Sequence, residues 1–195
     1  AMIGGMVGNN SCGLHSIVWG AARDHLLEAT VILSDGSTAV LKEVDLLEAA
    51  HNPSFEGNIY QEISALLLNT NNQGLIHQHF PSKEVVRRNT GYALDALLEM
   101  QPFNTSGSQF NLCKLLAGSE GTLAFITELK LNLLPLPPKE VGMVIVHCSS
   151  LVESLYANIE ALKHRPMASE LVDKIIMDFT IGHPEYQKNR FFIEG

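Results

Sequence analysis

The chain has 195 residues, enough for one domain or for one domain and part of a second. Hydrophobic residues make up 46% and charged residues 17% of it, a balance typical of a globular protein and not of a disordered one. The formal net charge is −8 and Lys and Arg do not cluster, which argues against nucleic acid as a partner. No apolar run approaches the roughly 20 residues of a membrane helix, so we expect no membrane span.

Cys12, Cys113 and Cys148 are odd in number, far apart and without a C-x-x-C pair. This pattern indicates neither a disulfide framework nor a zinc site, and it is typical of a reducing, cytoplasmic setting. The chain opens at once on a Gly- and Asn-rich stretch, without a preceding strand, helix or signal-like segment. Because such backbone needs flanking elements to hold it, we interpret the N-terminus as a cut end.

The first clear element is a β-hairpin over residues 26–44. Its two halves, LLEATVILS and STAVLKEV, are rich in β-branched residues and flank the two-residue turn signal Asp35-Gly36. Residues 54–68 space their apolar side chains at helical intervals, which predicts a helix with a polar exit at 69–72.

Further along, residues 90–100 predict a second helix. Residues 101–109, rich in Pro, Asn, Ser and Gly, predict a surface loop, and residues 123–134 alternate as a strand does. The tract Pro-Leu-Pro-Pro at 135–138 cannot continue a sheet ladder, so we place a domain boundary between residues 136 and 137.

The part beyond the boundary begins with a predicted strand at residues 141–147. Predicted helices follow at about 151–163 and 170–180, separated by Pro166, and no closing strand follows them. This order is that of an α+β domain of which only the first elements are present.

Two Gly-rich stretches are candidate ligand loops. Residues 3–13, IGGMVGNNSCG, can adopt φ > 0 and bring consecutive amide groups close to a diphosphate. A structural turn explains the same residues, since a lone Gly-rich loop is weak evidence. Residues 116–127, LAGSEGTLAFIT, join a tight loop to an apolar strand, and a helix C-cap before a strand explains them equally well.

A third stretch, residues 87–92 with the sequence RRNTGY, combines two guanidinium groups with a hydroxyl group. Together with Lys114 it could clamp a carboxylate, because Arg offers two parallel donors. Solvated surface charge is the simpler interpretation of any one of these cations. His77 and His79 lie in a predicted turn region and have no carboxylate or thiolate at ligand spacing, so we expect no metal site.

Together the three stretches resemble the FAD-linked oxidases of the vanillyl-alcohol oxidase or PCMH type. That family includes D-lactate, glycolate and D-2-hydroxyglutarate dehydrogenases, and the resemblance is greatest to large bacterial members with downstream iron–sulfur domains. The similar motifs are IGGMVGNN-SCG, Trp19-Gly20, the Arg-Asp-His turn at 23–25, RNTGY at 88–92 and GSEGTLAFITE at 118–128. They cover most of residues 3–138, whereas residues 141–180 are more loosely similar to the start of the family's substrate (cap) domain.

The resemblance implies an α+β fold. Residues 1–136 would be the second lobe of a PCMH-type FAD-binding domain, mainly an antiparallel sheet with flanking helices, and residues 137–195 the beginning of the cap domain. It also implies FAD as the cofactor, and we expect FAD to be bound non-covalently because no histidine lies in a recognisable flavinylation motif. The residues implied to contact FAD are Gly4, Gly5, Asn9, Asn10, Gly13, Glu120, Gly121, Ile126 and Thr127. Those implied to meet the substrate carboxylate are Arg87 or Arg88, Thr90 and Lys114.

The activity implied is oxidation of a small D-2-hydroxy acid by FAD, with electrons passed to an iron–sulfur domain or a quinone. We expect a piece of a longer enzyme, cytoplasmic or peripheral to the inner membrane, with its catalytic residue outside the chain. Two alternatives stay open. The chain could be a non-catalytic fragment unable to retain FAD, or the parent could be a flavin alcohol oxidase or reductase of the same fold.

Overall fold

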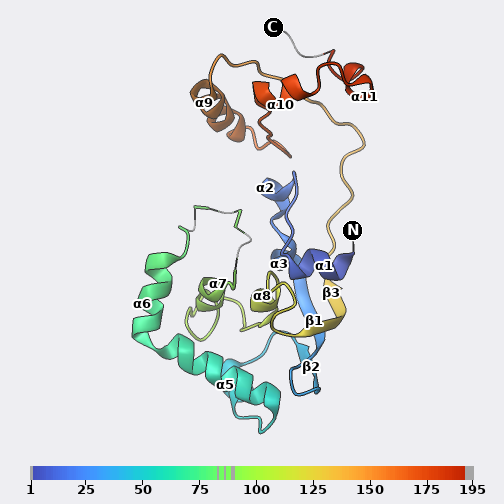
Figure 1. Cartoon of the computed structure of the whole chain (residues 1–195). Helices are drawn as coiled ribbons and strands as arrows, with labels where there is room; N and C mark the ends of the chain where they lie inside the picture. Colours follow the sequence, from blue (N-terminus) through green and yellow to red (C-terminus); the bar gives the residue numbers. More distant parts are fainter. Residues whose placement is uncertain (1, 83, 86, 89–90, 192–195) are drawn as a thin grey trace. The chain divides into compact units, whose positions relative to one another are not determined.

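The computed structural model describes residues 2–82, 84–85, 87–88 and 91–191. The chain forms two compact units, Ala1–Leu134 (unit 1) and Pro135–Gly195 (unit 2) (Figure 1). The assignment of the two parts to a flavin-binding lobe and a cap domain stays a prediction.

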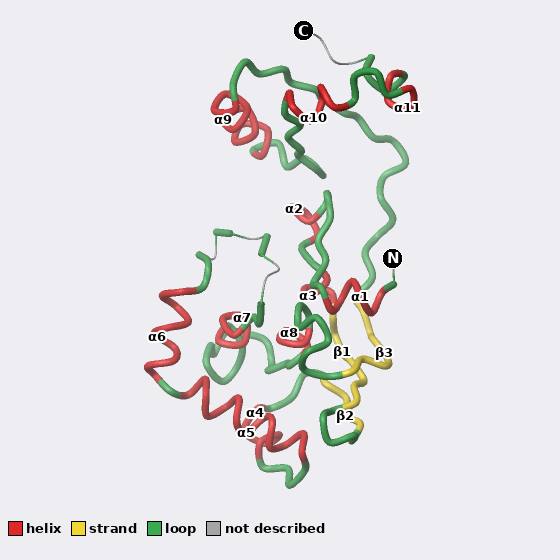
Figure 2. Tube along the Cα trace, in the orientation of Figure 1, coloured by secondary structure: helices red, strands yellow, loops and turns green. Residues whose placement is uncertain are grey.

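A three-stranded antiparallel sheet lies in unit 1, with the strand order β2-β1-β3 (Figure 2). Its strands are β1 (Leu26–Ile32), β2 (Thr38–Leu41) and β3 (Phe125–Leu131). The predicted hairpin is confirmed: Gly36 has a φ of 85° in the turn, and the Asp35 carboxylate accepts the backbone N–H of Ser37 at 2.9 Å. The strand predicted at 123–134 is confirmed as β3, and with the helices described next it makes unit 1 an α+β structure.

Three helices follow the hairpin: α4 (Leu46–Ala50), α5 (Phe55–Leu68) and α6 (Thr70–His79). The predicted helix is confirmed as α5, and Ser54 caps it by accepting the Gly57 N–H at 3.0 Å. The predicted polar exit is wrong, because Asn69 ends α5 and at once caps α6 by accepting the Asn71 N–H at 3.0 Å. His77 therefore lies in the last turn of a helix and not in a turn region.

Two short helices, α7 (Leu94–Leu98) and α8 (Cys113–Leu116), lie between α6 and β3. The helix predicted at 90–100 is present only as α7, and residues 89–90 lie outside the described residues. The inner face of the sheet packs with these helices around one core. Fully buried side chains at its centre are Val31, Tyr60, Leu67, Leu97, Phe110 and Leu116.

The N-terminal stretch forms three short helices, α1 (Ile3–Gly8), α2 (Ser16–Trp19) and α3 (Ala22–His25). The expected open, Gly-rich loop is thus wrong for residues 3–8, because glycine also accepts helical φ values and the Asn9 N–H closes a turn on the Gly5 carbonyl at 3.0 Å. Within residues 3–13 the left-handed conformation occurs at Asn10, with a φ of 52°.

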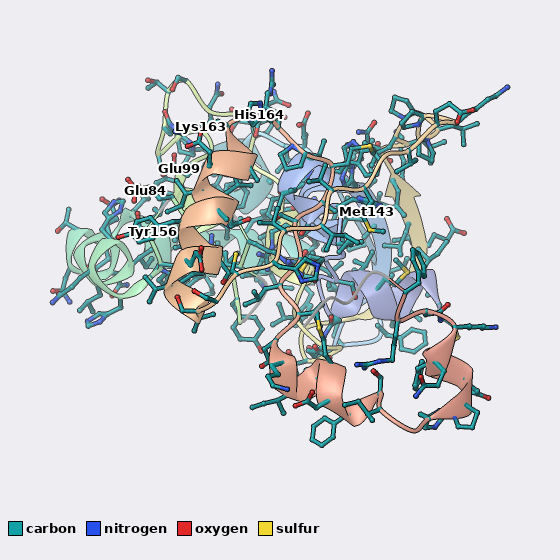
Figure 3. All side chains as sticks on the ribbon, turned by 90° about the horizontal axis from the view of Figure 1, so that it is seen from above. Glu84, Glu99, Met143, Tyr156, Lys163 and His164 are labelled. Carbon is teal, nitrogen blue, oxygen red and sulfur yellow. The ribbon has the colours of Figure 1, made fainter. Side chains whose placement is uncertain are left out.

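Unit 2 contains α9 (Leu151–Leu162), α10 (Lys174–Phe179) and α11 (Pro184–Gln187). The expected strand at 141–147 is not formed, because a strand needs a hydrogen-bonded neighbour and the described part of unit 2 offers none. Met143 in this segment is 77% exposed. Most side chains of α9 are exposed as well, among them Tyr156, and Lys163 follows the helix (Figure 3). No described residue of unit 2 is buried.

Candidate functional site

The two Gly-rich stretches, separated by more than a hundred residues, contact each other in unit 1. The Gly118 N–H donates to the Val7 carbonyl at 3.1 Å, and the Glu120 N–H donates to the Gly8 carbonyl at 2.9 Å. The Asn9 side-chain amide also donates to the Glu120 carboxylate at 2.8 Å. We call this contact between residues 7–10 and 117–120 the loop junction.

Two buried polar side chains of the loop junction have an unused hydrogen-bonding atom. The Asn10 side chain is 0% exposed, and its Oδ1 accepts the Arg23 N–H at 2.7 Å. Its Nδ2, and the Oγ of buried Ser119, have no hydrogen-bond partner among the described residues. A buried polar atom without a partner costs free energy, so these atoms indicate a place where a ligand or water completes the structure.

Arg23 of α3 lies behind the loop junction with only 6% of its surface exposed. Its Nε donates to the Lys114 carbonyl at 2.8 Å and its Nη2 to the Ala117 carbonyl at 2.6 Å. Burial, reinforced by the positive charge of Arg88, lowers the pKa of Arg23. Sequence reasoning noted this arginine only as part of a family motif and gave it no site role, because no local pattern shows which carbonyl groups it will meet.

A cavity of about 510 Å³ brings together cations from different stretches of unit 1. Arg23, Arg88 and Lys114 line it, together with acidic side chains such as Asp95 and Glu99. Its apolar lining comes from α6, α7 and the residues that follow each helix, and includes Ile76, Phe80, Ala96 and Met100.

Lys114 and Arg88 are held differently within this cavity. The Lys114 ammonium donates to the Arg23 carbonyl at 2.9 Å, and burial lowers the pKa of Lys114. Arg88 forms an ion pair with Asp95, and roughly a fifth of each side chain is exposed. Both cations are therefore already oriented by the protein.

Of the two candidate arginines, the structure places only Arg88 on the cavity. Arg87 points to the first Gly-rich stretch, where its Nε lies 3.3 Å from Cys12 Sγ. Thr90 lies outside the described residues. Tyr92, just after it, shares a 2.7 Å hydrogen bond with the hydroxyl of Thr122, which joins the third stretch to the second.

The remaining candidate residues have varied surroundings. A Cβ built on Gly4, Gly5, Gly13 or Gly121 would meet nothing within 4 Å. Ile126 is half-buried and packs on the core, whereas Thr127 is exposed and its hydroxyl donates to the Thr30 carbonyl at 3.1 Å. Their roles as FAD contacts stay a prediction.

The described residues offer neither a metal centre nor a membrane-spanning helix. No group of three His, Cys, Asp or Glu side chains there could hold a metal ion. None of the described helices combines the length and the apolar character needed to cross a membrane.

Comparison with known proteins gives matches of one kind. The chain is 33% identical over 181 residues to the D-2-hydroxyglutarate dehydrogenase of Pseudomonas putida (strain KT2440). This alignment covers 91% of the chain and 17% of the relative. It is 36% identical over 140 residues to the enzyme of that name from Pantoea ananatis, covering 70% of the chain and 13% of the relative. It is 31% identical over 181 residues to the D-2-hydroxyglutarate dehydrogenase of Escherichia coli K12, and this alignment covers 91% of the chain and 17% of the relative.

These matches confirm the resemblance that the motifs indicated, and the chain spans about a sixth of the length of the relatives it matches over 181 residues. No protein-family model matches the chain.

Proposed function

We propose, from the premise that this chain is homologous to one segment of the D-2-hydroxyglutarate dehydrogenases, that it builds part of the active site of an FAD-dependent dehydrogenase. The substrate is a small D-2-hydroxy acid such as D-lactate, glycolate or D-2-hydroxyglutarate. The observation that carries the proposal is that Arg88 and Lys114 line one cavity. Arg23 lines the same cavity and joins it to the loop junction through hydrogen bonds to the carbonyls of Lys114 and Ala117.

The cavity suits a carboxylate. An Arg guanidinium can donate two parallel hydrogen bonds to its oxygens, and an ammonium adds a mobile point charge. The Lys114 ammonium donates one of its three N–H groups to the Arg23 carbonyl, which leaves two N–H groups for a ligand. Asp95 keeps Arg88 oriented before the substrate arrives.

The loop junction and the glycines beside it fit FAD in two respects. Asn10 Nδ2 and Ser119 Oγ are buried and have no partner among the described residues, and the backbone at the exposed glycines is open to close approach. When bound, FAD would supply the hydride acceptor for C2 of the hydroxy acid. The residues proposed to hold it non-covalently are Gly4, Gly5, Asn9, Asn10, Gly13, Glu120, Gly121, Ile126 and Thr127.

In this proposal, unit 1 is the second lobe of a PCMH-type FAD-binding domain and unit 2 is the start of the substrate (cap) domain. The electron acceptor would be an iron–sulfur domain or a quinone. The enzyme works in the cytoplasm or at the inner membrane surface. The chain's own residues bind and orient the acid and the cofactor, and we assign the catalytic base to none of them.

The cofactor is tested by titrating FAD into the 195-residue chain while following flavin fluorescence and the visible spectrum. Stoichiometric binding with a perturbed spectrum supports the proposal. An unchanged free-flavin spectrum favours the alternative of a non-catalytic chain that cannot retain FAD.

The activity is tested in a chimera, in which this chain replaces the 181 aligned residues of the Pseudomonas putida enzyme. We expect Arg88→Ala and Lys114→Ala each to raise the KM for the hydroxy acid by the equivalent of about 2–5 kcal/mol, the range for truncating one member of a buried charge pair. Arg87→Ala and exposed Lys42→Ala are the matched controls, and we expect them to leave KM near the parent value. An unchanged KM in both cavity variants would instead favour a flavin alcohol oxidase or reductase of the same fold.

A further inference from the structure

Arg23 contacts both Gly-rich stretches and the cavity at once. Its backbone N–H donates to Asn10 in the first stretch, and its guanidinium donates to the carbonyl of Ala117 in the second. Its Nε and its own carbonyl are bonded to the carbonyl and the ammonium of Lys114. These four hydrogen bonds span 2.6–2.9 Å, and the three that involve Lys114 and Ala117 link segments that are 91 or 94 residues apart in the chain.

We propose that Arg23 is the positioning residue of this site, which fixes the two halves of the loop junction and sets Lys114 on the cavity. The inference deepens the proposed function and rests on it only for the identity of the ligands. Arg23 acts through its neighbours and is not itself assigned to the reacting atoms.

The burial of the guanidinium supports a positioning role rather than surface charge. Among the described residues, no carboxylate forms an ion pair with Arg23, and its guanidinium donates instead to the carbonyls of Lys114 and Ala117, while Asp95 and Asp24 act on its charge only through space. A buried cation is retained at a cost unless its donors are used. The planar, rigid arrangement of its N–H groups holds two carbonyls at a fixed separation, which the single ammonium of lysine cannot do.

The packing around Gly118 shows how closely Arg23 is held. A Cβ at this position would lie 2.9 Å from Arg23 Nη2 and 3.3 Å from Asn10 Cβ. The three residues therefore contact one another with no room for a side chain between them, and a shift of the guanidinium moves the loop junction with it.

The pairing with Lys114 is reciprocal. Arg23 Nε donates to the Lys114 carbonyl, and Lys114 Nζ donates back to the Arg23 carbonyl. One residue thereby fixes the backbone of α8 and the ammonium that we propose for the substrate. Loss of Arg23 should disturb the cofactor loops and the substrate cation together.

Hydrogen exchange on the full 195-residue chain without ligand tests this inference directly. In Arg23→Met we expect the Gly118 and Glu120 amides to exchange faster by roughly tenfold or more, since a bond to a charged group is worth at least about that factor. Amides that join β1 to β2 should exchange as in the parent chain. Arg23→Lys should be intermediate, because it can reach one carbonyl, and it supplies the comparison if Arg23→Met does not fold.

Leu67→Ala is the matched control for general destabilisation. Leu67 is fully buried in α5, a helix that packs against α4 and α6. Its truncation should not selectively expose the Gly118 and Glu120 amides. Equal protection of these amides in the parent and Arg23 variants, or equal loss in Leu67→Ala, would overturn the inference.

The same variants separate this inference from the proposed function. In the chimera, Arg23→Lys should weaken FAD binding and raise KM for the hydroxy acid by about tenfold each, with a smaller change in kcat, while Leu67→Ala changes neither affinity. If the parent chain and the chimera bind no FAD, the proposed function fails, and hydrogen exchange still decides the role of Arg23. If FAD binds but the Arg23 variants bind it equally well, the positioning role fails alone.

Discussion

Gly118 is the residue at which the loop junction is most sensitive to a single methyl group. It has a φ of 92°, which disfavours any side chain, and its Cβ position is crowded by Arg23 and Asn10. We expect Gly118→Ala to lower the free energy of unfolding by about 3 kcal/mol, from backbone strain plus crowding. Gly36→Ala is the control, because Gly36 has a φ of 85° but open space around its Cβ, so it should lose only about 1–2 kcal/mol. Equal losses in urea unfolding would show that crowding at Gly118 has no effect.

Cys113 should make the protein less stable in alkali. The side chain is fully buried, its Sγ lies 3.3 Å from the Leu41 carbonyl, and burial raises the pKa of the thiol from 9.0 to about 12. Because the unfolded thiol ionises first, the contribution of this residue to stability is present below about pH 9 and is lost progressively as pH rises towards about 12.

The measurement for Cys113 is the difference in unfolding free energy between the parent chain and Cys113→Ala. We expect the advantage of the parent to shrink by about 1 kcal/mol between about pH 8 and about pH 10, because one pKa unit corresponds to about 1.4 kcal/mol. A constant difference over this range would contradict a raised thiol pKa.

At the scale of the helices, capping has consequences only where the helix contributes to the core. Ser54 caps α5, which buries Tyr60 and Leu67, whereas Ser150 caps α9, which buries no residue. We expect Ser54→Ala to lower the stability of unit 1 by about 1 kcal/mol. Ser150→Ala removes the same kind of bond but should leave the urea midpoint of unit 1 unchanged. A shift in that midpoint with Ser150→Ala would be evidence against this interpretation.

The helices also show where local patterns are sufficient. The Asp35-Gly36 turn and the capped, apolar α5 are encoded within a few residues, and both were predicted. Asn69 can end one helix or begin the next, so the neighbouring sequence does not reveal that α6 follows directly. The stretch at 141–147 has strand composition but no described partner, and local composition does not provide one.

At the scale of the whole chain, the core belongs to unit 1. All described buried residues lie between Val7 and Ser119, and unit 2 contributes none. We therefore expect a chain ending at Leu134 to keep a cooperative urea transition, with a free energy of unfolding within about 0.5 kcal/mol of that of unit 1 in the parent. Circular dichroism and the fluorescence of Trp19 follow the transition. A broad or absent transition in the shortened chain would mean that unit 1 does not fold by itself.

The sequence by itself determined the hairpin, the helix α5 and the motifs that resemble the D-2-hydroxyglutarate dehydrogenases. These features depend on neighbours within one element or on the order of short motifs. Only the tertiary structure decided that Arg88 rather than Arg87 lines the cavity with Lys114, and that Arg23 joins the loop junction to it. The physical reason is that these residues come from different stretches of the chain, with Arg23 bonded to residues 91 and 94 positions away, and such pairings depend on how the whole core packs.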